Sequence, residues 1–161
     1  MTKAGWAIFA GVALFITQVL RGIQALRITL DGYSFDSVSL SDGTVGMYLY
    51  FKIVNPLWVG ITLKEISGEL TAVSDQTQQP EIIGTVYNRY NYFIRGNATH
   101  QVRAKIKVNA QSVIAATMQN VASGDINNLL LTFSGKLVFG GTKEVSLPIK
   151  RTMTFRELTG K

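Results

Sequence analysis

Apolar side chains occupy every second position of residues 45–53, and this pattern is the clearest structural signal in the chain. Successive side chains on a β-strand point to opposite faces, so the spacing predicts a strand with one apolar face. After a break at Asn55-Pro56, the apolar positions of residues 61–70 predict a second strand. We expect six side chains of these two strands to be buried between two sheets: Met47, Leu49, Phe51, Ile53, Ile61 and Leu63.

The same period of two recurs along most of the chain beyond residue 27. It predicts further strands over residues 28–40, 85–94, 101–109, 128–139 and 145–155. A slip of phase at Asp31-Gly32 predicts a bulge, and Ser41-Asp42-Gly43 predicts the turn of an antiparallel hairpin. Short strands at such spacing usually close as two antiparallel sheets packed face to face, so we expect a mainly β domain, an antiparallel β-sandwich, over residues 28–161.

Two segments interrupt the strand pattern. Residues 73–84 are polar and include Pro80, which predicts an exposed loop. Residues 110–122 have helical spacing after Asn109, a suitable N-cap, and they predict one short helix.

The N-terminal segment has a different pattern, because residues 4–20 carry no charge at all. Seventeen helical residues span about 25 Å at about 1.5 Å each, slightly less than a hydrocarbon core of about 30 Å. Continuing to Leu26 provides enough length if Arg21 reaches the membrane interface. We reject a cleaved signal peptide because no small-residue cleavage site follows the apolar run. Residues 1–27 are therefore predicted to form an apolar α-helix that spans a membrane or packs within an assembly.

On that predicted helix, Ala7, Gly11, Gln18 and Gly22 fall along one stripe. Small residues four apart let another backbone come close, and Gln18 could donate a hydrogen bond across the contact. Gly and Ala are also common in apolar helices without any such role. We expect residues 4–26 to contact membrane lipid, other protein chains, or both, in a homo-oligomer or a multi-component assembly.

The amino-acid composition excludes several kinds of functional site. The chain has no cysteine and one histidine, so disulfides, thiolate metal sites and histidine clusters are excluded. Half of the net charge of +6 comes from Lys3, Arg21 and Arg27, beside the apolar segment, which leaves the β-domain only mildly basic. We expect a protein that is not an enzyme and that uses no cofactor and no metal.

The strand motifs resemble a known family. Residues 54–56 (Val-Asn-Pro), 61–63 (Ile-Thr-Leu), 66–70 (Ile-Ser-Gly-Glu-Leu), 133–137 (Phe-Ser-Gly-Lys-Leu) and 145–149 (Val-Ser-Leu-Pro-Ile) look like the group 2 late embryogenesis abundant (LEA) proteins, whose domain is also called the WHy domain. The resemblance implies a small β-sandwich related to fibronectin-type folds, often behind a hydrophobic anchor, with a binding, protective or structural role. It supplies no catalytic residue, and its signature is the turn Asn55-Pro56.

Basic residues follow one predicted strand face at Arg103, Lys105 and Lys107, with Arg89 and Arg95 upstream among aromatic residues. Basic groups interleaved with aromatics can bind phosphates and stack bases. A solvated outer strand face gives the same stripe, and we favour it because the domain is only mildly basic. Nucleic acid is therefore not an expected partner.

The other polar residues form no recognisable constellation. His100 is expected to be a surface histidine in a loop, and Asn97-Ala98-Thr99 is a formal glycosylation acceptor. The carboxylates are scattered over predicted strand ends and loops, at Asp42, Glu65, Glu69, Asp75 and Glu81. We therefore expect a membrane-anchored, non-enzymatic module of unassigned orientation. The alternative is a structural subunit of a large assembly such as a virus particle, with virion localisation.

Overall fold

Seven strands account for most of the protein in the computed structural model, which describes residues 22–39, 41–73, 80–112, 130–140 and 144–154. The strands are β1 (Arg27–Ser39), β2 (Thr44–Asn55), β3 (Ile61–Val73), β4 (Pro80–Ile94), β5 (Ala98–Asn109), β6 (Leu130–Gly140) and β7 (Glu144–Thr154). The prediction of a mainly β, antiparallel domain is confirmed.

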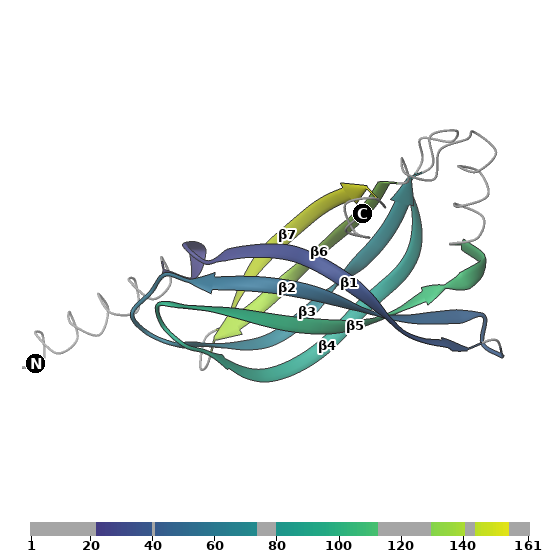
Figure 1. Cartoon of the computed structure of the whole chain (residues 1–161). Helices are drawn as coiled ribbons and strands as arrows, with labels where there is room; N and C mark the ends of the chain where they lie inside the picture. Colours follow the sequence, from purple (N-terminus) through teal and green to yellow (C-terminus); the bar gives the residue numbers. More distant parts are fainter. Residues whose placement is uncertain (1–21, 40, 74–79, 113–129, 141–143, 155–161) are drawn as a thin grey trace, which may run out of the picture.

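All seven strands belong to one sheet, in the order β1-β2-β5-β4-β3-β6-β7. The sheet curls until it is nearly closed, as Figure 1 shows. The expectation of two separate sheets is therefore not what the structure has. The sheet is weakest between β4 and β5, which pair only over three residue pairs from Gly84↔Val108 to Val86↔Ile106. That short ladder joins a three-stranded part, β1-β2-β5, to a four-stranded part, β4-β3-β6-β7.

The core fills the concave side of the curled sheet. All six side chains that the alternation placed in the core are buried there: Met47, Leu49, Phe51, Ile53, Ile61 and Leu63. They meet inward side chains of β5 and β6, for example Ile106 and Phe133. The alternating pattern of β5 is as predicted, with Arg103, Lys105 and Lys107 exposed on the outer face.

The β1–β2 hairpin matches its prediction. The strands pair antiparallel, and the register shifts between Leu30 and Gly32, where the sequence predicted a bulge. Gly43 takes a φ of 59° in the turn, a value that glycine adopts at little cost. Asn109 caps the helical turn that follows β5, because its Oδ1 accepts the N–H groups of Gln111 and Ser112.

Two sequence expectations are wrong. Residues 80–84 are the start of β4 and not part of a loop, since Pro80 pairs with Val73 at a strand end, where its missing N–H costs little. His100 lies in β5 opposite Ile53 and not in a loop.

Other predictions lie mostly outside the described residues. Of the predicted helix over residues 110–122, residues 110–112 are described, and they are helical. Of the predicted N-terminal helix, residues 22–24 are described as helical, and β1 begins at Arg27. No helix among the described residues has the length and apolarity needed to cross a membrane.

Candidate functional site

Asn55 organises the end of the molecule drawn on the left in Figure 1, where the β2–β3 and β4–β5 connections lie. It is the one fully buried polar side chain in the part of the chain that the structure describes. Its Nδ2 donates to the carbonyl oxygens of Val59, at 3.0 Å, and Arg95, at 3.1 Å. Its Oδ1 accepts the Leu57 N–H at 3.0 Å. Asn55 therefore joins two connections that are 40 residues apart in sequence.

We call residues 56–60 and 95–97 the loop end. Backbone contacts hold its two parts together: the Asn97 N–H donates to the Leu57 carbonyl at 2.6 Å, with Asn97 at a φ of 50°. Gly96 lies against the carbonyl of Trp58, so closely that a Cβ at Gly96 would collide with it. The loop end is therefore well ordered by its own contacts.

His100 supports the same connection from β5. Its Nε2 accepts the Arg95 N–H at 3.1 Å, which requires that nitrogen to carry no proton. Its Nδ1 lies 3.2 Å from the Tyr92 hydroxyl, and the two rings meet edge to face with centroids 5.7 Å apart. The single histidine thus has a structural role in fixing the turn after β4.

The N-terminal segment joins the domain beside the loop end. Gly22 is buried, and a Cβ there would collide with the Leu57 side chain. Ile23 and Leu26 follow at once as members of the core. Of the predicted helix stripe, Ala7, Gly11 and Gln18 lie outside the described residues. The small size of Gly22 serves a contact within the same chain.

Large apolar side chains are exposed at this end. Trp58 is 75% exposed, and Phe93, which packs over Gly60, is 59% exposed. Tyr92 beside it is 41% exposed. Trp58 was not among the residues predicted to be functional. An apolar loop, residues 56–60, in a place where polar turn residues are usual was the signal that could have found it.

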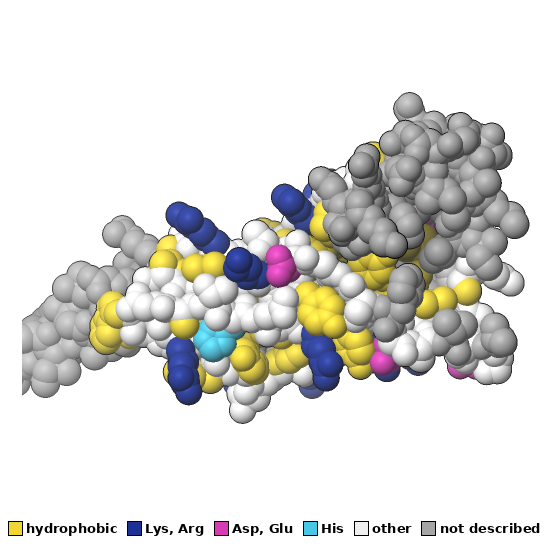
Figure 2. All heavy atoms as spheres, viewed as in Figure 1, with side chains coloured by type: hydrophobic (Ala, Val, Ile, Leu, Met, Phe, Trp, Pro, Cys, Tyr) yellow, Lys and Arg dark blue, Asp and Glu magenta, His cyan; other side chains and the backbone are white. Residues whose placement is uncertain are grey.

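The five basic residues predicted as one surface are divided by the structure. Arg103, Lys105 and Lys107 lie on β5, Arg89 lies on β4, and Arg95 belongs to the loop end. On the face shown in Figure 2, the dark blue side chains stand apart from one another and form no continuous patch. A single basic surface is therefore absent from this face.

Two of the β5 cations, Arg103 and Lys105, have partners on β1 and β2. The Arg103 guanidinium lies 4.9 Å from the centre of the Tyr48 ring, and the Lys105 ammonium lies 5.7 Å from the same ring. Lys105 also pairs with Asp36 at 2.6 Å. The hydrogen bond from Lys105 holds the pKa of the Asp36 carboxyl below its usual value, and the same bond raises the pKa of Lys105. Arg103, Lys105 and Lys107 thus lie on an exposed outer strand face, where Arg103 and Lys105 have partners within the chain.

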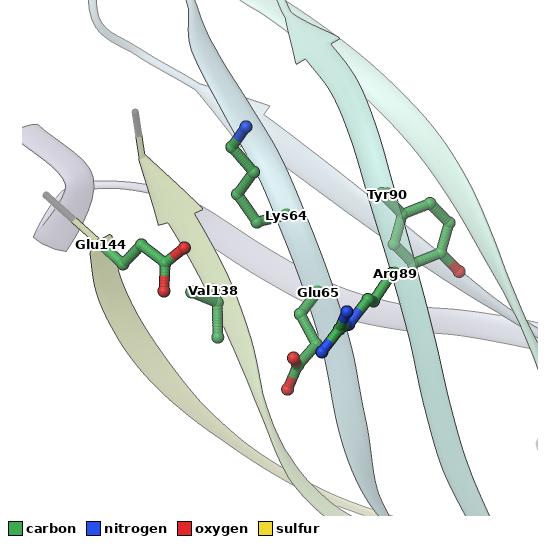
Figure 3. Close-up of a pocket in the computed structure, with 6 residues that line it drawn as sticks. All are labelled: Lys64, Glu65, Arg89, Tyr90, Val138 and Glu144. Carbon is green, nitrogen blue, oxygen red and sulfur yellow. The ribbon is translucent and has the colours of Figure 1, made fainter. Parts of the chain in front are cut away.

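A shallow hollow of about 390 Å³ lies elsewhere on the outer surface, and Figure 3 shows the six residues that line it: Lys64, Glu65, Arg89, Tyr90, Val138 and Glu144. Arg89 and Glu65 extend into the same part of the hollow, whereas Lys64 and Tyr90 point away from them. The hydrogen bond with Tyr87 raises the pKa of Arg89, and the attraction of Glu65 and Glu144 adds to the rise. Glu65 accepts a hydrogen bond from Ser67 and the Tyr90 hydroxyl donates to the Arg103 carbonyl, and we assign no catalytic role to this lining.

Metal ligation is equally unsupported in the described ranges, where no three His, Cys, Asp or Glu side chains gather. Of the carboxylates singled out from the sequence, Asp75 lies outside the described residues. Among the others, Glu65 accepts a hydrogen bond from Ser67 at 2.9 Å.

Comparison with known proteins supports the fold. No protein-family model matches the sequence, and no curated protein is similar to it. A protein from Arabidopsis thaliana of known solution structure is similar in fold, with a TM-score of 0.62 and 12% identity over 80% of this chain and 79% of that chain. A crystal structure of a protein from Archaeoglobus fulgidus has a TM-score of 0.54 and 11% identity over 79% of this chain and 96% of that chain. At these identities the likeness concerns the fold alone.

A third solved structure is a candidate late embryogenesis abundant (LEA) protein. It is 14% identical over 97% of this chain and 90% of that chain. Its TM-score of 0.43 is too low to carry an argument.

Proposed function

We propose that this protein is a non-enzymatic, membrane-anchored β-module of the group 2 LEA (WHy) type, with a binding or protective role. The family assignment is supported by the Asn55-Pro56 turn and by two Ser-Gly motifs that pair in the sheet, with Gly68 directly opposite Gly135. The module is held to the membrane by residues 4–20, and the sandwich-like closure of its sheet forms a rigid body outside the bilayer.

One observation carries the anchoring role. The uncharged segment leads into the folded domain without a linker, because Gly22 packs against Leu57 and Ile23 is already in the core. A segment of seventeen residues without a charge needs an apolar environment, since it has no polar face to turn toward water. Lipid provides that environment, and the junction fixes the domain to whatever holds the segment.

An assembly role through the helix stripe is the less favoured alternative. It rests on Ala7, Gly11 and Gln18, because Gly22 is occupied by Leu57 of the same chain. Gly11→Leu separates the two functions: it should disrupt self-association by blocking close approach and leave the membrane attachment unchanged.

Extraction of cell membranes tests the anchor. The full chain should stay in the pellet after washing with high salt and then with alkaline carbonate. Replacing Val12 and Ile16 together by Lys should release it, because two charges at the centre of the segment oppose insertion by about 5 to 7 kcal/mol in total. The double replacement by Leu at the same positions is the matched control and should stay in the pellet. Release of the unchanged chain by alkaline carbonate would overturn the proposal.

A further inference from the structure

The loop end exposes aromatic side chains that the core does not need. Trp58 and Phe93 are 75% and 59% exposed, although burying each would remove a large apolar area from water. Scattered apolar residues are normal on a protein surface, but Trp58 lies in the loop end, and Phe93, near the end of β4, packs over Gly60 of the same loop end. They form one apolar tip on a rigid support.

The tip lies close to the N-terminal segment, because only a short stretch of chain separates that segment from a residue that contacts the loop end. Gly22 contacts Leu57, the neighbour of Trp58 in sequence. The last residue of the uncharged segment, Leu20, is two residues away from Gly22, and two residues span at most about 7 Å. Any membrane that holds residues 4–20 therefore begins close to the loop end.

The chain segments that form the tip and adjoin it carry charges of one sign, while Glu144, the first residue of β7, lies toward the same end of the sheet. Residues 20–30, 55–62 and 90–102 include no acidic residue, whereas they include Arg21, Arg27 and Arg95. Arg95 belongs to the loop end, and Arg27 begins β1 opposite Val54, one residue before Asn55. Arginines attract anionic lipid headgroups, and Trp and Tyr favour the boundary between headgroups and hydrocarbon.

The rigidity of the loop end also favours a membrane as its partner. The hydrogen bonds of Asn55 and His100 hold both connections in place before any contact with lipid. A surface that is already ordered loses little conformational entropy on binding. A small, fixed aromatic tip suits a fluid interface, which adapts its own shape to the protein.

We infer that the loop end inserts into the headgroup layer of the membrane that anchors residues 4–20, with Trp58 and Phe93 at the hydrocarbon boundary and Arg95 on the lipid phosphates. This inference rests on the proposed anchoring role. It adds a second membrane contact, which fixes the orientation of the β-domain: β2 and β4 point toward the bilayer with their C-terminal ends, and the β1–β2 hairpin points away from it.

Fluorescence of Trp58 tests the inference in the full chain. Trp6→Phe leaves Trp58 as the single tryptophan, because the chain has only two. The protein is reconstituted into vesicles of phosphatidylcholine and phosphatidylglycerol, with or without phosphatidylcholine brominated on the acyl-chain carbons near the headgroup. We expect Trp58 emission to shift to shorter wavelength and to be quenched by the brominated lipid.

A matched reporter is provided by Tyr87→Trp in a chain that also carries Trp6→Phe and Trp58→Phe. Tyr87 is 61% exposed on β4, six residues before Phe93, and thus about 20 Å farther along the strand. Its emission should stay that of a tryptophan in water, and the brominated lipid should not quench it. Equal quenching of both reporters would contradict the inferred orientation.

The failure of the inference and the failure of the anchor give different results. A chain that floats with the vesicles while Trp58 is neither shifted nor quenched overturns the inference and leaves the anchor intact. A chain that does not float with the vesicles overturns both. A shift of Trp58 emission without quenching indicates burial against protein and also counts against lipid insertion.

Discussion

The rings of Phe51 and Phe133 meet edge to face, with centroids 5.3 Å apart and an angle of 64° between the ring planes. Phe51 lies on β2 and Phe133 on β6, and three strands separate these two in the sheet. Strands lie about 4.8 Å apart, so a flat sheet would hold the two positions roughly 19 Å from each other. The contact exists because the sheet curls around its own apolar face.

Removing one of these rings should destabilise the whole domain. Both side chains are fully buried, so Phe133→Ala should lower the free energy of unfolding by about 3 to 5 kcal/mol through lost burial and a residual cavity. Urea unfolding followed by circular dichroism measures the loss. Phe93→Ala is the control, because an exposed ring contributes about 1 kcal/mol or less. Equal losses in the two variants would show that the assigned core is wrong.

The sequence predicted which side of each strand faces inward, but it could not predict which strands face one another. Period-two alternation depends only on neighbouring residues, so the sequence could predict that Leu49 and Ile53 point inward. The meeting of Phe51 with Phe133 depends on strand order and on sheet curvature, which arise from contacts between distant residues. For the same reason, the expected two sheets proved to be one sheet with a short β4–β5 ladder.

Asn55 should be intolerant of the smallest chemical change to its side chain. Asn55→Asp keeps the shape but replaces the Nδ2 donor with an oxygen that faces the carbonyls of Val59 and Arg95. We expect a loss of about 3 to 5 kcal/mol at neutral pH, because the new buried charge faces two carbonyl oxygens and keeps only the Leu57 N–H as a donor. The loss should shrink as the pH falls, since protonation of the new carboxyl restores one donor.

Asn109→Asp is the matched control for that substitution. Asn109 uses its Oδ1 as an acceptor for two N–H groups of the described residues, so a carboxylate can replace it with a change of about 0.5 kcal/mol or less. Chemical unfolding of both variants at neutral and acidic pH measures the difference. If Asn55→Asp were as harmless as Asn109→Asp, the loop end would not depend on the Nδ2 hydrogen bonds.

Only part of the candidate site could be predicted from the sequence. A turn at Asn55-Pro56 was expected from the sequence, and there the Leu57 N–H donates to the Asn55 Oδ1. The bond to the Arg95 carbonyl joins residues 40 positions apart, so no local pattern could reveal it. Arg95 was grouped with the β5 cations because they are close in sequence, but the β4–β5 turn carries it to the loop end.

Gly135 should resist the addition of a single methyl group. It faces Gly68 across the β3–β6 ladder, and a Cβ there would collide with the Ser67 carbonyl oxygen and the Phe133 ring. Backbone atoms of a paired strand cannot move aside easily, so Gly135→Ala should cost about 1 to 3 kcal/mol. Ser134→Ala, at an exposed neighbouring position, should change stability by about 0.5 kcal/mol or less. Thermal unfolding of both variants compares them. A neutral Gly135→Ala would argue against the close approach of the two Ser-Gly motifs.

The hydroxyl of Tyr90 should lose its proton only at unusually high pH, because Tyr90 connects β4 to β5 beyond the end of the ladder between these two strands. Its hydroxyl donates to the Arg103 carbonyl at 2.7 Å, and partial burial raises its pKa to about 12. The unfolded chain releases this proton near pH 10, so the stabilising contribution of Tyr90 is complete below about pH 10 and is lost as the pH rises toward 12. Titration of tyrosinate absorbance should therefore show a component at high pH in the unchanged protein that is smaller in Tyr90→Phe, where Tyr33, whose pKa burial also raises, still contributes. Tyr92→Phe, at an exposed position, should keep that component in full. If the high-pH component were undiminished in Tyr90→Phe, the bridge to Arg103 would not shield this hydroxyl.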